Sequence, residues 1–125
     1  EPRQVALTSS TTDGCNIVLA GLDLQSDDEV ITTTDEHFGL LGPLHASGAK
    51  VVVVSPAADA ILSGVTPRTK LIAISQVLWT TGQILPVREL RERSWRSGTS
   101  CGARCSWARG TTRATGGARP DADPP

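Results

Sequence analysis

Apolar positions in the first ninety residues alternate between helical spacing and short continuous runs. Four of them recur at the spacing of one buried helix face, and Gly21 marks the end of that helix: Cys15, Val18, Leu19 and Leu22. Three short runs of β-branched and apolar residues predict strands at 30–34, 50–55 and 71–74. The middle run is continuous, as in a strand buried on both faces. Helical stretches lie between the strands, the first of them interrupted by Gly42 and Pro43.

This alternation predicts an α/β fold, a three-layer α/β/α arrangement with a mainly parallel sheet. In such sheets ligands gather where the strands end. The expected strand ends are 34–37, Ser55 and 75–82. The turn that opens the first helix should lie beside them.

The amphipathic pattern stops after Leu90. Arg91 and Ser94 fall at the next inward positions of the last helix, and residues 91–125 contain no Val, Ile, Leu, Met or Phe. We expect residues 1–90 to fold and residues 91–125 to be disordered. The tail's Arg, Gly, Ala, Pro, Ser and Thr bias is typical of a GC-rich gene read out of frame. We therefore expect an N-terminally incomplete, C-terminally frameshifted fragment, with a genuine basic tail as the alternative.

Charge and cysteine content restrict the function further. The net charge of -1 gives no reason to expect nucleic acid or an anionic membrane as a partner. No apolar run approaches the roughly 20 residues that span a bilayer. Cys15, Cys101 and Cys105 form no recognisable disulfide framework or metal set, so a reduced, cytoplasmic setting is expected.

Hydroxyl residues gather where the first helix begins. Either Ser10 or Thr12 suits the N-cap, and Asp13 is favourable in the first turn. Unpaired N–H groups and hydroxyl donors at a helix start can hold a phosphate or carboxylate. These residues could equally cap the helix and bind nothing, so both interpretations stay open.

Three blocks together carry a family resemblance: VALTSSTTDGCNIVLAGL, DEVITTTDEHFGLLGPL and RTKLIAISQVLWTTGQILPVREL. They resemble consecutive segments of the class V aminotransferases, pyridoxal-phosphate (PLP) enzymes of fold type I that include cysteine desulfurases and isopenicillin N epimerase-like proteins. The resemblance runs from Val5 to Leu90 and implies that residues 1–90 are part of the large domain of a PLP-dependent transferase.

The resemblance implies specific cofactor contacts. Ser10, Thr11 and Thr12 would hold the cofactor phosphate, and His37 would stack on the pyridine ring. Trp79 would lie near the phenolic oxygen of the cofactor and favours the epimerase-like branch, with simple loop packing as its alternative.

The lysine that would form the Schiff base is missing. The only lysines, Lys50 and Lys70, open predicted strands and should lie away from the site. We therefore expect no catalytic residue and no activity in this chain alone. The intact parent would be a homodimer that acts on an amino acid by transamination, epimerisation or desulfuration. The alternative is a non-catalytic phosphate- or nucleotide-binding α/β module, although no G-x-G-x-x-G or P-loop motif is present.

Overall fold

A computed structural model of the chain describes residues 6–96. Helices and strands alternate along this part in the order α1 (Thr11–Gly21), β1 (Glu29–Thr33), α2 (Phe38–Ala46), β2 (Lys50–Val54), α3 (Ala58–Ser63), β3 (Thr69–Ile72) and α4 (Val87–Arg96). Among these residues no helix is long and apolar enough to cross a membrane.

The three strands form a parallel sheet in the order β2-β1-β3, as the alternating pattern predicts. In β1, which lies in the centre, all five residues are buried. Glu29 pairs with Lys50 of β2 and with Thr69 of β3, so the three strands begin at the same edge of the sheet. A register shift between Glu29 and Val30 interrupts the pairing of β1 with β3.

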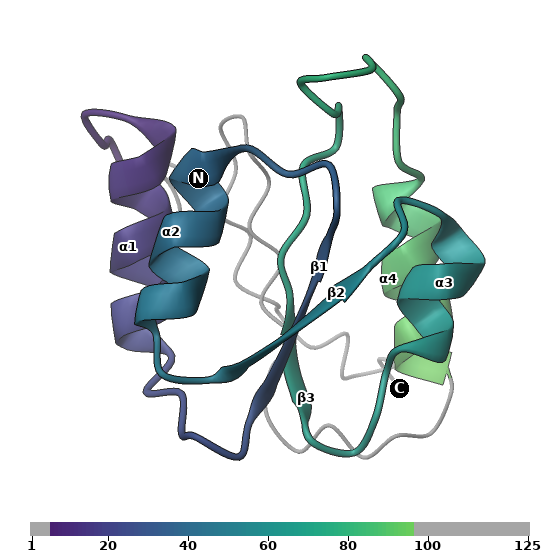
Figure 1. Ribbon diagram of the computed structural model, residues 1–125, viewed down its shortest axis with the longest axis horizontal. Helices are drawn as coiled ribbons and strands as arrows, with labels where there is room; N and C mark the ends of the chain where they lie inside the picture. Colours follow the sequence, from purple (N-terminus) through teal and green to yellow (C-terminus); the bar gives the residue numbers. More distant parts are fainter. Residues whose placement is uncertain (1–5, 97–125) are drawn as a thin grey trace, which may run out of the picture.

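Helices cover both faces of the sheet and complete the three layers (Figure 1). One core lies between the sheet and the first two helices, formed by Leu19, Val30, Leu44, Leu71 and Ala73. The second core lies on the opposite face, where Ile61 of α3 and Leu90 of α4 pack against Ile31 and Ile72. Alternate residues of β1 therefore serve separate cores, which explains why the strand has no solvent-exposed face.

Three sequence predictions differ from the structure. The strand β2 is half-exposed instead of buried on both faces, because it lies at the edge of the described sheet, and Val53 is 49% exposed. The helix α2 continues through Gly42 and Pro43 without interruption. Proline removes only one N–H from this short helix, and Leu44 beyond it is fully buried against the sheet.

The third difference concerns the predicted boundary at Leu90. The helix α4 runs six residues further, to Arg96. Arg93 forms ion pairs with Asp59 of α3 at 3.0 Å and with Glu89 one turn earlier at 3.0 Å, so polar contacts accompany the last turns where the apolar stripe ends. The predicted disorder of residues 97–125 concerns a part of the chain outside the described residues.

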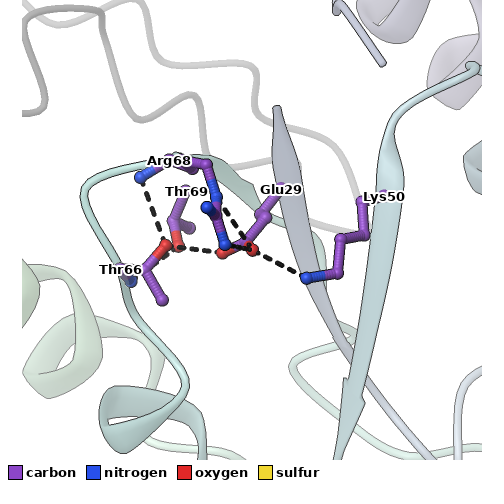
Figure 2. Close-up of polar contacts among 5 residues, drawn as sticks. All are labelled: Glu29, Lys50, Thr66, Arg68 and Thr69. Atoms are coloured by element: carbon purple, nitrogen blue, oxygen red, sulfur yellow. Dashed lines mark hydrogen bonds and ion pairs between the residues drawn. The ribbon is translucent and has the colours of Figure 1, made fainter. Parts of the chain in front are cut away.

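A buried carboxylate joins the three strands where they begin (Figure 2). Glu29 of β1 accepts hydrogen bonds from Lys50 of β2 at 3.0 Å, from Thr66 at 2.5 Å and from Arg68 at 2.8 Å. These donors, Thr66 first, lower the pKa of Glu29 from 4.5 to about 2. Lys70 lies at the same edge and pairs with Asp28 at 3.8 Å. Both lysines of the sequence are therefore held at the strand starts, at the end opposite to the candidate site described below.

Candidate functional site

Two helices begin at the edge of the sheet where the strands end, and their N-termini lie side by side (Figure 1). A pocket of about 270 Å³ lies between these N-termini and the segment that follows β3. It is lined by Thr11, Thr12, Cys15, His37, Gly39, Leu40, Ile74, Ser75 and Val77. Its volume is close to the lower end of the range for small-molecule sites, roughly 300–1,000 Å³.

The first wall of the pocket is the start of α1. Ser10 is the N-cap, with extended backbone, and its Oγ accepts the N–H of Asp13 at 3.1 Å. Within the described residues, the N–H groups and hydroxyls of Thr11 and Thr12 have no hydrogen-bond partner. Four donors therefore stand unpaired at the positive end of the helix macrodipole, which is how backbone sites hold phosphate or carboxylate groups.

Asp13 lies in the same turn, and its negative charge would repel an anionic ligand. The carboxylate of Asp13 accepts hydrogen bonds from the N–H and the hydroxyl of Ser9, both at 3.2 Å. One of its oxygens, Oδ2, is therefore engaged with Ser9, the residue before the N-cap. The acid fixes the shape of the turn at the cost of some electrostatic attraction for a ligand.

The second wall is the start of α2, where His37 is the N-cap. Its Nδ1 accepts the N–H of Gly39 at 3.0 Å, so in the neutral ring the proton is carried by Nε2. The ring centroid lies 4.0 Å from that of Phe38 and 5.0 Å from that of Trp79, the latter edge to face. A flat ligand ring could pack against the imidazole in such an aromatic setting.

Gly39 allows the two helix starts to approach closely. A methyl group at this position would lie 2.5 Å from Oγ1 of Thr12 and 3.0 Å from Nδ1 of His37. Only a residue without Cβ fits there while both side chains keep their places. The two walls of the pocket therefore meet at Gly39.

Cys15 lies one turn into α1 and lines the floor of the pocket with a nearly buried side chain. Burial raises the pKa of its thiol above the ordinary value of 9.0, because the thiolate would lose solvation. The thiol is therefore neutral at physiological pH and contributes packing rather than a nucleophile.

The structure brings most of the predicted site residues together. Thr11, Thr12 and His37 line one pocket. Ser10 stands just outside it as the helix cap, and Trp79 reaches the site through its edge contact with His37 while 61% of its surface stays exposed. Their roles toward a cofactor stay predictions.

Sequence reasoning missed Gly39, Glu36 and Ser75. Glu36 could have been found as a charged residue directly after an apolar strand, a place where burial requires partners. The close approach at Gly39 depends on tertiary packing and left no signal in the sequence.

Fold and site together define an α/β protein with a pocket between two helix N-termini at the C-terminal edge of a parallel sheet. The chain belongs to the class V aminotransferase family, because the sequence model of that family matches residues 1–101. The resemblance of the three sequence blocks is thereby confirmed, and the match extends eleven residues beyond Leu90, where the resemblance was predicted to end. No curated protein matches the chain.

Solved structures of PLP-type enzymes share the fold. A mutant of C-DES with glycine covalently linked to its PLP cofactor is 27% identical, with a TM-score of 0.70 over 87% of this chain and 30% of that one. The cysteine desulfurase CsdA from Escherichia coli is 25% identical, with a TM-score of 0.69 over 86% of this chain and 29% of that one. DndA from Streptomyces lividans is also 25% identical, with a TM-score of 0.69 over 86% of this chain and 32% of that one. The chain thus spans about a third of the length of these proteins.

Proposed function

We propose that residues 6–96 form the phosphate and ring-stacking part of a PLP site in a class V aminotransferase-like protein that acts on an amino acid. The observation that carries this proposal is that unpaired donors at the start of α1 and the imidazole of His37 at the start of α2 line one pocket. The donors would bind a phosphate, and the imidazole would pack on the face of a planar ring.

The residues of this chain would divide the binding work. Thr11 and Thr12 would donate their hydroxyls and N–H groups to the phosphate, and Ser10 would keep the helix start rigid. His37 would lie flat on the pyridine ring, and Trp79 would close the side of the imidazole. When bound, PLP supplies an electron-withdrawing ring that stabilises negative charge on the α-carbon of an amino acid.

The same chain has no group suited to covalent cofactor attachment. Lys50 and Lys70 are the only lysines in the sequence, and they pair with Glu29 and Asp28 at the opposite edge of the sheet. We propose that the chain alone binds the cofactor without turnover. In the whole protein the reaction would be transamination, epimerisation or desulfuration. Trp79 favours the epimerase-like branch, and we further propose a homodimeric, cytoplasmic parent.

Binding of pyridoxine 5′-phosphate to the full chain tests the proposal. This alcohol has the ring and phosphate of the cofactor but no aldehyde, so it cannot react with Lys50 or Lys70. We expect calorimetry to detect binding that the double variant Thr11→Val/Thr12→Val weakens by about tenfold or more, since hydrogen bonds to charged groups are the strong ones.

The matched control is the double variant Thr11→Ser/Thr12→Ser, which keeps both hydroxyls and should bind within about twofold of the wild type. Equal binding by the valine and serine variants would refute the proposal that the hydroxyls of Thr11 and Thr12 bind the phosphate. Binding of adenosine monophosphate but not of pyridoxine 5′-phosphate would instead favour a nucleotide-binding module.

The origin of the C-terminal part is a separate proposal. We propose, as before, that the tail is read out of frame; the helix to Arg96 and the family match to residue 101 support a start of such a tail beyond Leu90. Translation of the gene downstream of codon 90 in all three frames tests it. A second frame that encodes an Asp-bearing strand and a later lysine would support the hypothesis, and its absence would refute it.

A further inference from the structure

Glu36 is a buried carboxylate that the proposed function does not use. It lies in the loop between β1, which ends at Thr33, and α2, and is 5% exposed. It accepts hydrogen bonds from the hydroxyl of Thr33 at 3.0 Å, the N–H of Ser75 at 2.9 Å and the hydroxyl of Ser75 at 2.5 Å. Both carboxylate oxygens are engaged, Oε1 with Thr33 and the N–H of Ser75 and Oε2 with the hydroxyl of Ser75.

The position of Glu36 links the two sides of the pocket. The next residue is His37, whose ring lines one side, and Ser75 opens the segment that carries Val77 and Trp79 on the other. Thirty-nine positions separate Glu36 from Ser75 in the sequence. The carboxylate is therefore a direct polar connection between the end of β1 and the segment that follows β3.

That segment, residues 75–85, behaves as one unit. An antiparallel bridge joins Val77 to Ile84, and two backbone hydrogen bonds join its arms, from Leu78 to Gln83 at 2.9 Å and from Leu85 to Gln76 at 2.8 Å. Leu78 and Leu85 anchor it in the core on the α3/α4 face of the sheet. Fixing Ser75 thus fixes the place at which this unit meets His37.

We propose that Glu36 is a positioning residue that holds the imidazole of His37 against the 75–85 segment and so sets the width of the slot for a planar ligand ring. This inference rests on the proposed function. It predicts that loss of the carboxylate weakens recognition of the ring while recognition of the phosphate at the start of α1 is retained.

The variant Glu36→Gln tests this with little change in size. The amide removes the negative charge and puts an NH₂ donor in place of Oε2, so the short hydrogen bond with the hydroxyl of Ser75 must reverse its direction and loses its charged partner. Glu29→Gln is the matched control, because Glu29 is also a buried carboxylate that joins strands but lies at the opposite edge of the sheet. Both variants should lose stability, but only one of them should alter the pocket.

The measured quantity is the ratio of the dissociation constants of inorganic phosphate and pyridoxine 5′-phosphate, taken at a temperature where circular dichroism shows each variant folded. We expect Glu36→Gln to lower the preference for the ring-bearing ligand by roughly fivefold to tenfold, in line with the strength of aromatic contacts. Phosphate affinity should change less than about twofold, and Glu29→Gln should leave the preference unchanged.

Ser75→Ala is a milder test if Glu36→Gln does not fold. Ser75→Ala removes the 2.5 Å contact, keeps the backbone contact at 2.9 Å, and should lower the same preference by a smaller factor. An unchanged preference in the folded variants, or an equal loss in Glu29→Gln, would overturn the positioning role. Failure of the wild type to bind pyridoxine 5′-phosphate at all would instead refute the proposed function, and this inference with it.

Discussion

The close approach of the two helix starts can be tested by replacing Gly39, so that the side chains proposed to bind the ligand stay unchanged. In Gly39→Ala the new methyl group would lie 2.5 Å from Oγ1 of Thr12, well inside van der Waals contact, and 3.0 Å from Nδ1 of His37. The hydroxyl of Thr12 can turn away by rotation about χ1. The imidazole cannot move without losing its bond to the N–H of residue 39, so the threonine should give way.

The expected effects follow from the helix stability that alanine adds and the hydrogen bond to phosphate that Thr12 loses. Replacing a helical glycine by alanine stabilises a helix by up to about 1 kcal/mol, which offsets part of the clash, so global stability should change little. Turning the hydroxyl of Thr12 out of the pocket removes one donor to a charged acceptor, worth about 1.5 kcal/mol or more. We therefore expect an affinity for inorganic phosphate that is about tenfold weaker.

Gly42 of the same helix is the matched control, because nothing lies within 4 Å of a methyl group placed there. Gly42→Ala should raise the free energy of unfolding by up to about 1 kcal/mol and leave phosphate binding unchanged. Calorimetric titration of both variants, with urea unfolding in parallel, compares them directly. Equal phosphate affinity in the two variants would show that Thr12 does not donate to the anion.

Three further predictions concern stability and reactivity. The pKa of Glu29 is lowered to about 2, so the stabilisation from its carboxylate is complete above pH 4.5 and is lost as the pH falls toward 2. Over this range the free energy of unfolding should fall less steeply in Glu29→Gln than in the wild type. The surface variant Glu89→Gln is the control and should behave as the wild type does. Ser10→Ala removes the N-cap of α1 and should cost about 1 kcal/mol in urea unfolding, whereas Ser26→Ala, at an exposed turn position, should cost less than about 0.5 kcal/mol. Burial raises the pKa of Cys15, so iodoacetamide at pH 8 should label it much more slowly in the folded chain than in urea, as peptide mass spectrometry would show; equal rates would contradict the buried thiol.

Much of the fold could be predicted because the apolar pattern is strong. Short continuous runs between helical stripes identify strands, and their alternation with helices leaves a parallel sheet as the simplest arrangement. The burial of β2 was predicted wrongly, because a run such as Val51–Val54 has the same composition at an edge as in the centre of a sheet. Order within the sheet depends on tertiary pairing, which no local pattern contains.

The candidate site was predictable in part. The hydroxyl residues Thr11 and Thr12 predict the start of a helix. A role for His37 in binding a ring could be predicted only from the family resemblance. The sequence could have marked Glu36 as a charged residue after an apolar strand, but its partner Ser75 could not be predicted, because the fold brings the two residues together. Disorder was predicted from residue 91, yet α4 continues to Arg96, because a helix whose inward positions become polar can still continue through contacts such as Arg93 with Asp59.

The central place of β1 has a consequence for the growing chain on the ribosome. This strand is translated first, yet both of its neighbours come later, β2 about twenty positions downstream and β3 about forty. Its five residues are all buried in the finished sheet, with Val30 and Ile31 among the most apolar. Until β3 has emerged, at least one edge of this apolar strand lies open to pairing with other nascent chains. Translation speed across residues 34–72 should therefore influence how much of the protein escapes aggregation during synthesis.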